Sequence, residues 1–290
     1  MPAGPISTPV SVSPPQPNNP QLPEPKDRVM RIATWNINSV RLRLPTVLRF
    51  LQEQAPDVLC LQETKTEDKT FPAEALKDAG YVHQAIRGMK SYNGVAVVSR
   101  VPFTDEGQRD WCGKMDCRHL AVRLDGGPEV HNFYVPAGDE PDPAINDKFA
   151  HKLDFLAEMQ SWFGAERKGS DPMVLVGDLN IAPLEHDVWS HKQLLKVVSH
   201  TPIEVEELGK LQAGLGWVDA VRHFVPETEK LYSWWSYRSK NWELADKGRR
   251  LDHVWVTEPL KNRLKSAAVV KAMRGGEKPS DHAPVIVDLD

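Results

Sequence analysis

The 290-residue sequence has few cysteines, no membrane-length apolar run and no overall excess of positive charge. Its three cysteines, Cys60, Cys112 and Cys117, show no C-x-x-C spacing, so neither a disulfide framework nor a zinc site is indicated and a reducing cytoplasm is favoured. No window approaches the roughly 18 consecutive apolar residues of a membrane helix, so we expect no membrane association. The net charge of −4 excludes a general attraction to nucleic acid.

Positive charge is nevertheless concentrated in one segment. Residues 222–274 contain 12 Lys or Arg against six Asp or Glu, interleaved with Trp234, Trp235, Tyr237, Trp242 and Trp255. Basic and aromatic side chains together suit a polyanion with stacked bases. The same pattern is also typical of a solvated cationic surface over core tryptophans, and composition leaves both interpretations open.

The chain divides into a tail and one regular region. Residues 1–28 are rich in Pro, Ser and Asn, which predicts a disordered tail that is not a secretory signal. Residues 29–290 alternate strand-like and helical patterns around a long amphipathic helix at 148–163. Strands are predicted at 31–37, 56–64, 82–86, 94–100, 119–124, 129–136, 173–181, 231–237, 249–257, 267–272 and 283–289, and further helices at 44–54 and 71–80. The predicted fold is α/β, a four-layered sandwich of two packed mixed β-sheets flanked by helices.

Polar residues stand where the apolar strands end. They are Asn36, Glu63, Tyr134, Asp178, Asn180, Asp252, Asp281 and His282. If these strand ends face the same way, their side chains converge on one cleft at a rim of the sandwich. Carboxylates and amides with one His and no Cys favour a hard cation such as Mg²⁺ over zinc, and this inventory suits hydrolysis of a phosphate ester.

Each of these residues also has a purely structural interpretation. Glu63 could cap a helix or lie on the surface, Asn180 could form a turn, Tyr134 could be a core ring, Asp252 could pair with Arg249 or Arg250, and the Asp281-His282 dipeptide could be a capped turn. Taken together, so many polar strand ends favour the functional interpretation.

The motifs and their order resemble the exonuclease III family of abasic-site endonucleases, in the endonuclease/exonuclease/phosphatase superfamily. The matching segments are TWNIN (34–38), LQETK (61–65), NGVAVVSR (93–100), YVPAG (134–138), GDLNI (177–181), YRSK (237–240), GRRLD (248–252) and SDHAPV (280–285). The resemblance runs from about Met30 to the C-terminus. The YRSK and GRRLD segments indicate the DNA repair branch of the superfamily.

The resemblance implies a role for each site residue. Glu63 would be the main ligand of Mg²⁺, for which Mn²⁺ could substitute, and Asn36 and Asp281 would be further metal residues. Asp178 would be the base that takes a proton from water, Asn180 would orient the water or the phosphoryl group, Tyr134 would contact the scissile phosphate, and Asp252 would orient His282. His282 would donate to a non-bridging phosphate oxygen.

The substrate pocket is implied in the same way. Asn38, Trp234, Trp235 and Leu251 would contact substrate, the last three as the wall that receives a flipped-out abasic sugar, although the two tryptophans could equally be core. Two positions depart from the family pattern. Ala137 replaces an amide that reaches a phosphate, and Arg249 stands where some relatives have an aromatic residue.

The expected function is a Mg²⁺-dependent DNA repair nuclease that hydrolyses the phosphodiester 5′ of abasic sites, with 3′–5′ exonuclease and 3′-end-cleaning activity. Its expected partner is double-stranded DNA with abasic sites or 3′ ends, and it would act as a monomer in the cytoplasm, on the nucleoid in a bacterium. Two alternatives are a phosphatase of lipid or inositol phosphates and a non-catalytic DNA-binding module on the same fold. The sequence leaves open the balance of endonuclease, exonuclease and 3′-phosphatase activities.

Overall fold

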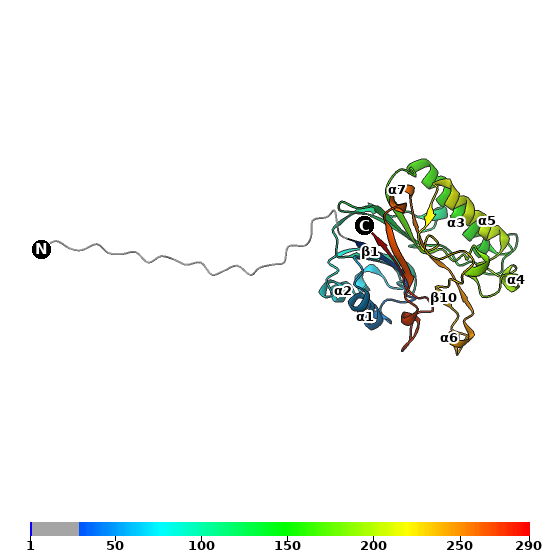
Figure 1. Cartoon of the computed structure of the whole chain (residues 1–290), viewed down its shortest axis with the longest axis horizontal. Coiled ribbons are helices and arrows are strands. Elements are labelled where there is room, and N and C mark those ends of the chain that lie inside the picture. Colours follow the sequence, from blue (N-terminus) through cyan, green and yellow to red (C-terminus); the bar gives the residue numbers. More distant parts are fainter. Residues whose placement is uncertain (2–28) are drawn as a thin grey trace.

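The computed structural model describes Met1 and residues 29–290 (Figure 1). Except for Met1, the predicted tail of residues 1–28 lies outside the described residues. Among the described residues, no helix is both long enough and apolar enough to cross a membrane. The assignment of residues 29–290 to one catalytic domain stays a prediction.

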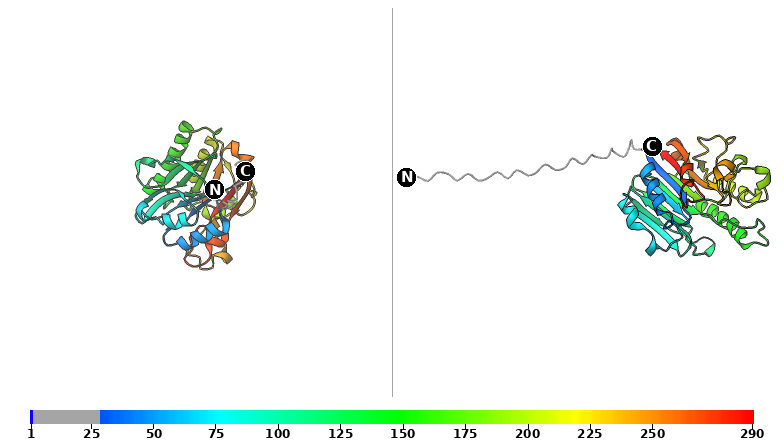
Figure 2. Two further views of the ribbon diagram at one scale, coloured as in Figure 1. Left: turned by 90° about the vertical axis from the view of Figure 1, so that its left-hand side faces the viewer. Right: turned by 90° about the horizontal axis from the view of Figure 1, so that it is seen from below.

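One six-stranded mixed sheet contains both the first and the last strand of the fold. Its order is β13-β14-β1-β2-β4-β3, in which β1 and β2 run parallel and the other neighbours antiparallel. The strands are β1 (Met30–Asn36), β2 (Val58–Gln62), β3 (His83–Met89), β4 (Tyr92–Ser99), β13 (Leu264–Val269) and β14 (Val285–Leu289). Because β1 pairs with β14, the start and the end of the fold lie side by side (Figure 2).

The second six-stranded sheet has the order β5-β6-β7-β8-β12-β9, with β7 and β8 parallel. Its strands are β5 (Phe103–Gly107), β6 (His119–Leu124), β7 (Glu129–Tyr134), β8 (Met173–Asp178), β9 (Val218–Asp219) and β12 (Asp252–Val256). A two-stranded ribbon pairs β10 (Trp234–Trp235) with β11 (Gly248–Arg249).

Helices cover the outer faces of the two sheets. In Figure 1, α1 (Leu44–Gln54) and α2 (Ala73–Asp78) lie on one side and α3 (Asp147–Glu166) and α5 (Pro202–Gly214) on the opposite side. Three buried apolar clusters fill the layers: one between the sheets around Val97 and Val176, one under α1 around Trp35 and Phe50, and one under α3 around Phe133 and Phe155. Three short helices, α4 (His191–Leu194), α6 (Trp242–Ala245) and α7 (Glu258–Lys261), lie in connections. The predicted four-layered sandwich is confirmed.

A polar bridge crosses the apolar layer between the sheets. Gln62 at the end of β2 donates from Nε2 to Asn132 Oδ1 on β7 at 2.7 Å and to Thr34 Oγ1 on β1 at 2.8 Å. Asn132 Nδ2 in turn donates to the carbonyls of Leu61 and Ala96, both at 3.0 Å. Buried amides that are paired in this way fix one alignment of the two sheets.

Most of the predicted helices and strands are present, but many of them begin or end at residues other than those predicted. The helix at 44–54 is correct to the residue. The strand predicted at 173–181 ends at Asp178, because the chain turns into a left-handed conformation at Asn180. The segment 231–237 contains only the two-residue strand β10, and the exposed edge strand β5 was not predicted because its sequence, FTDEG, has little apolar pattern.

Candidate active site

The polar strand ends from both sheets meet at one rim. The parallel pair β1 and β2 ends in register at Asn36 and Gln62, and the parallel pair β7 and β8 ends at Tyr134 and Asp178. Asn36 joins the two sheets, because its Nδ2 donates to Glu63 Oε1 and to Asp178 Oδ2, each at 2.8 Å. The amide of one sheet therefore holds two carboxylates, one from each sheet, against each other.

Three of the predicted site residues have strained backbone, among them Asn38 with φ 47°. Glu63 has φ 50° and Asn180 has φ 54°, the left-handed region that non-glycine residues seldom adopt. Neighbouring backbone hydrogen bonds hold the first, since Thr64 N donates to the Gly94 carbonyl at 3.1 Å. Strain of this kind costs on the order of 1–3 kcal/mol and clusters at functional sites, where it aims side chains into a cleft.

His282 is held by an acid and a hydroxyl. Its Nδ1 lies 2.8 Å from Asp252 Oδ2, and Ser233 Oγ donates to the same oxygen at 2.6 Å. His282 Nε2 lies 3.7 Å from Asp178 Oδ2, too far for a hydrogen bond but close enough for strong electrostatic coupling. Burial alone would lower the pKa of His282, but the Asp252 and Asp178 carboxylates outweigh it and raise the pKa to about 10. The ring is therefore an imidazolium at neutral pH.

The carboxylates of the site differ in charge state. Burial raises the pKa of Asp178 to about 7, with Asp252 and Glu63 acting in the same direction, against the opposing effects of His282 and Asn36. Burial also acts to raise the pKa of Glu63, but the Lys65 ammonium, 2.7 Å from Glu63 Oε2, and the Asn36 amide leave it below its ordinary value. The cluster thus combines an ionised carboxylate with one that exchanges a proton near neutral pH.

Tyr134 contributes a phenol that stays protonated. Its side chain is almost fully buried, and the Arg118 guanidinium lies 4.7 Å from the ring centroid. Burial, followed by the carboxylates of Glu63 and Asp178, raises the pKa of Tyr134 well above its ordinary value. The hydroxyl is therefore a hydrogen-bond donor at the rim.

Asp281 has both carboxylate oxygens engaged. Oδ1 accepts from Asn38 Nδ2 at 3.1 Å, and Oδ2 accepts from Trp234 Nε1 at 2.9 Å. These contacts bring three of the predicted residues together. Each of these oxygens keeps a second lone pair, so the role of Asp281 as a metal residue stays a prediction.

Three expectations about individual side chains need correction. Trp235 is 2% exposed and packs with Tyr232 and Ala283, so it is a core residue and no pocket wall. Leu251 is 5% exposed and packs with Trp234 in an apolar cluster, so little of its side chain is open to a ligand. The strand predicted at 173–181 would place Asn180 on the same face as Asp178, but β8 ends at Asp178. Asn180 Nδ2 instead donates to the Val135 carbonyl at 2.9 Å, and its N–H donates to Asp178 Oδ1 at 3.0 Å.

The basic and aromatic segment 222–274 is partly structural. Arg250 is buried and pairs with Asp187 and Asp219, and not with Asp252. Arg274 is buried against the Trp235 carbonyl. Part of the positive charge counted in the sequence is therefore neutralised inside the fold.

Three supporting residues were not predicted. Lys65 donates to Asn38 Oδ1 at 2.6 Å besides pairing with Glu63. Ser233 holds Asp252, and Ser280 Oγ donates to the Asn36 carbonyl at 2.7 Å. Lys65 lies in the LQETK motif and Ser280 in the SDHAPV motif, so their closeness in sequence to Glu63 and His282 could have indicated a supporting role. No sequence feature indicated Ser233.

Lys152 on α3 is a buried cation that fixes the loops beneath the rim. Its Nζ donates to the carbonyls of Asn180, at 2.9 Å, and Ala137, at 3.2 Å, and it pairs with Glu204. Both side chains of this pair are 0% exposed. The lysine thus ties the backbone next to Asn180 to the helix behind it.

Replacing Lys152 by methionine should destabilise the fold by about 3–5 kcal/mol, because it leaves the Glu204 charge buried and unpaired. The measurement is the free energy of unfolding in urea. Lys148→Met on the same helix is the matched control, since its pair with Asp139 is exposed and worth at most about 1 kcal/mol. Equal stabilities of the two variants would contradict the role given to the buried pair.

The donor set at the rim fits a divalent cation. Asp178, Asp252 and His282 offer ligand atoms that lie within 4.8 Å of one another. Glu63 and Asp178 converge on the Asn36 amide, and Asp252 Oδ1 is buried without a hydrogen-bond partner. Three carboxylates against His282 and Lys65 leave negative charge that a metal ion would compensate. Because His282 is charged and bound to Asp252, oxygen atoms of Glu63 and Asp178 are better ligands than its ring.

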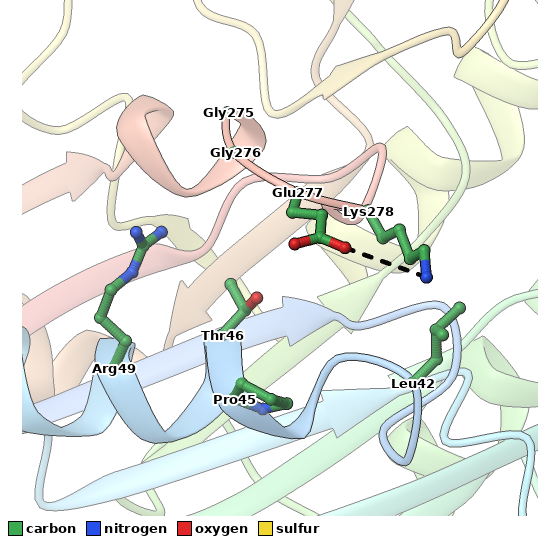
Figure 3. A pocket seen from close by; sticks show the side chains of 8 residues that line it. All are labelled: Leu42, Pro45, Thr46, Arg49, Gly275, Gly276, Glu277 and Lys278. Atoms are coloured by element: carbon green, nitrogen blue, oxygen red, sulfur yellow. Dashed lines mark ion pairs between the residues drawn. The ribbon is translucent and has the colours of Figure 1, made fainter.

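Two hollows flank this rim. One of about 480 Å³ includes Tyr134 in its wall together with Tyr92, Arg118 and His151. The other, of about 370 Å³, lies between the start of α1 and the Gly275–Lys278 turn, where Glu277 and Lys278 form an ion pair and Arg49 extends from the helix (Figure 3). It contains none of the predicted site residues.

A two-sheet sandwich with carboxylates, a charged histidine and a phenol at one rim has the groups for hydrolysis of a phosphate ester, and the relatives named below identify the chain as a hydrolytic nuclease of the phosphodiesterase type. Residues 33–282 match the Endonuclease/Exonuclease/phosphatase family, and the chain belongs to this family. It is 30% identical over 267 residues to exodeoxyribonuclease III of Haemophilus influenzae, covering 88% of this chain and 98% of that protein. The predicted exonuclease III family membership is thereby confirmed.

Solved structures agree with this assignment. An AP endonuclease from Archaeoglobus fulgidus superposes with a TM-score of 0.85 at 33% identity, covering 90% of this chain and 99% of that one. A 3′ phosphatase from Neisseria bound to a product DNA hairpin superposes with a TM-score of 0.82 at 33% identity, covering 90% and 99%.

Proposed function

We propose that this chain is a DNA repair nuclease that hydrolyses the phosphodiester bond 5′ of abasic sites in double-stranded DNA and also removes 3′ nucleotides and 3′ blocking groups. The observation that carries the proposal is the Asn36 amide, which joins Glu63 and Asp178 beside the His282–Asp252 pair. The names of the relatives, an exodeoxyribonuclease, an AP endonuclease and a 3′ phosphatase, support this substrate range. Action as a monomer in the cytoplasm, on the nucleoid in a bacterium, belongs to the same proposal; the cysteines, all free, agree with that location.

Asp178 is the proposed base. Its carboxylate has a pKa of about 7, which suits the transfer of a proton from water at neutral pH. Asn180 lies two residues on, and because its Nδ2 donates to Val135, its Oδ1 is left to accept a hydrogen bond from the same water. The attacking water would thus be oriented by two groups on rigid backbone.

His282 and Tyr134 are the proposed donors to the phosphate. The imidazolium and the protonated phenol carry no negative charge, so both can donate to non-bridging oxygens as charge develops there. Asp252 acts by holding the imidazole in place. Asn38 and Trp234 are proposed to contact the sugar and backbone, with Asp281 behind them.

Mg²⁺, or Mn²⁺ in its place, is the proposed metal, held by Glu63 and Asn36, with Asp281 as a further ligand that acts through a water molecule. When bound, it neutralises phosphate oxygens and stabilises the leaving O3′. Oxygen ligands and the absence of a thiolate from this part of the rim favour this choice over zinc.

The test is product analysis on a duplex that carries one abasic analogue, with Mg²⁺ and with a chelator. Nicking on the 5′ side that needs the divalent ion is expected. Faster turnover of an inositol phosphate headgroup than of DNA would instead support the phosphatase alternative. Tight binding of the damaged duplex without any cleavage would support the non-catalytic alternative.

Replacing Glu63 by glutamine should raise the Mg²⁺ concentration needed for half-maximal nicking by more than about 10-fold, because a ligating carboxylate is lost. The measurement is the nicking rate over a Mg²⁺ titration. Glu67→Gln is the control, since this acid lies in the same loop and its pair with Lys69 is exposed. An unchanged Mg²⁺ titration for the Glu63 variant would exclude Glu63 as a ligand.

A further inference from the structure

The loop that follows β8 is held by three buried side chains from separate parts of the fold. Three consecutive carbonyls of this loop each accept a hydrogen bond from one of them: those of Asn180, Ile181 and Ala182. The donors are Lys152 Nζ on α3 to the first at 2.9 Å, His253 Nε2 on β12 to the second at 2.8 Å, and His200 Nδ1 before α5 to the third at 2.6 Å. The backbone of this loop is therefore tied to a helix, a strand and a turn at once.

The two histidines have defined tautomers. A carbonyl oxygen can only accept, so the bonding nitrogen must carry the proton, which is Nε2 in His253 and Nδ1 in His200. His200 Nε2 then accepts from His191 Nδ1 at 2.8 Å. Within residues 29–290, His253 Nδ1 has no hydrogen-bond partner. Burial lowers the pKa of both rings, that of His253 to about 4, so each is a neutral donor at neutral pH.

His253 reaches the loop from the face of β12 opposite the proposed catalytic groups. Neighbouring residues of a strand point to opposite faces, so His253 points away from the side on which Asp252 contacts His282. Its ring packs edge-on against Trp255, with centroids 5.8 Å apart, and Trp255 belongs to the apolar cluster under α3. The printed contact of His253 with the loop is the hydrogen bond to the Ile181 carbonyl, and its effect on the site would pass through that bond.

The residue that these bonds hold in place is Asn180. It adopts φ 54°, a conformation that a non-glycine residue keeps only where its surroundings impose it. Its N–H donates to Asp178 Oδ1 at 3.0 Å. A shift of the loop would therefore move the side chain proposed to orient the water and also remove a contact of the proposed base.

We propose that His253 and His200 are positioning residues for the hydrolysis, which act through the carbonyls of Ile181 and Ala182 to hold Asn180 beside Asp178. This inference rests on the proposed function, because it assigns further residues to the same reaction. Loss of either donor would leave a buried carbonyl unpaired, and the loop would relax from its strained conformation. Small displacements of reacting groups lower the rate of the chemical step, so the loss should fall on the rate and not on DNA affinity.

The test uses the different lengths of two amide side chains. The amide nitrogen of glutamine reaches about as far as Nε2 of histidine, and that of asparagine about as far as Nδ1. His253→Gln should therefore keep the bond that His253→Asn loses, whereas His200→Asn should keep the bond that His200→Gln loses. On a duplex with one abasic analogue and Mg²⁺, the bond-losing variants should nick about 10-fold more slowly in a single turnover with unchanged Kd, and the bond-keeping variants within about threefold of the wild-type rate.

A second measurement does not depend on activity. Ala182 N–H donates to the Ser199 carbonyl at 2.7 Å and Leu179 N–H to the Leu251 carbonyl at 2.9 Å, so hydrogen exchange at these two amides, followed by NMR, reports on opening of the loop. Both amides should exchange about 10-fold faster in the bond-losing variants, as expected for one lost hydrogen bond.

His131→Gln is the control for a general loss of stability. His131 on β7 is equally buried, and its ring nitrogens lie against His119 and Glu129. This variant should be less stable, but its folded fraction should nick at the wild-type rate.

Several results would overturn the inference. Equal losses from glutamine and asparagine at each position, or a slow His131→Gln variant, would assign the effect to packing. A loss at His253 alone would mean that this residue acts through its neighbour Asp252. Wild-type nicking by the bond-losing variants would contradict the inference and leave the proposed function intact. If the wild type does not nick the duplex, the proposed function fails, and hydrogen exchange decides alone: unchanged exchange in the bond-losing variants would show that the two histidines do not hold the loop.

Discussion

Replacing Asp178 by asparagine should lower the single-turnover rate of nicking at an abasic site by about 10²–10⁴-fold, the range typical of a lost general base. The physical reason is that the amide cannot take the water proton. Asparagine keeps the size of the side chain, and it can still accept a hydrogen bond from Asn36 Nδ2, so the rim should keep its shape. The measurement is the amount of nicked strand over time with Mg²⁺ and enzyme in excess.

The control for this variant is Asp154→Asn, at an exposed acid on α3. It should nick at the wild-type rate. The Asp178 variant should still bind the abasic duplex, because it removes a negative charge near the phosphate and creates no clash. Undiminished nicking by Asp178→Asn would remove the base from the proposed mechanism.

Replacing His282 by glutamine should lower the nicking rate by about 10²–10³-fold, as for the loss of one donor to a developing oxyanion. The imidazolium, whose pKa is raised to about 10, is replaced by a neutral amide, so a charge-assisted hydrogen bond is lost. The loss should fall on kcat more than on KM, because the bond strengthens as charge develops on the phosphate. His223→Gln, at an exposed histidine, is the control and should leave both parameters unchanged.

Asp252→Asn gives a second, independent readout of the same unit. If Asp252 acts by holding His282, the double variant should be little slower than His282→Gln alone. If the loss of rate in the double variant equals the product of the losses in the two single variants, Asp252 has a role separate from holding His282. A fast Asp252→Asn variant would contradict the positioning role.

The fold was predictable because its elements are long and their apolar patterns are strong. The 44–54 helix begins at the Leu44-Pro45 pair and ends where Ala55 turns left-handed, and the amphipathic pattern alone locates its body. The two-residue strands β9, β10 and β11 have too few residues for any periodicity, and they form because tertiary neighbours supply their partners. Their position is a property of the packed fold.

The site was partly predictable for a related reason. The rule that a polar residue next to a buried strand lies at an edge of the sheet selected Asn36, Glu63, Asp178 and His282. The sequence pattern could not predict that Trp235 is a core residue and Trp234 is partly exposed. The two are neighbours in a two-residue strand, and which of them is buried depends on how that strand pairs with Gly248 and Arg249. Nor could it predict that Arg250 is neutralised by Asp187 and Asp219 while Arg249 forms no ion pair within residues 29–290.

The hydrogen bond between Gln62 and Asn132 has a consequence for how this protein tolerates change. Purely hydrocarbon surfaces can slide over one another with little penalty, and a slide of a single residue would separate Glu63 from Asp178, which belong to different sheets. The hydrogen bond between the side-chain amides of Gln62 and Asn132 opposes such a slide. Volume-conserving substitutions in the apolar layer should therefore be tolerated better than the loss of either amide of this pair.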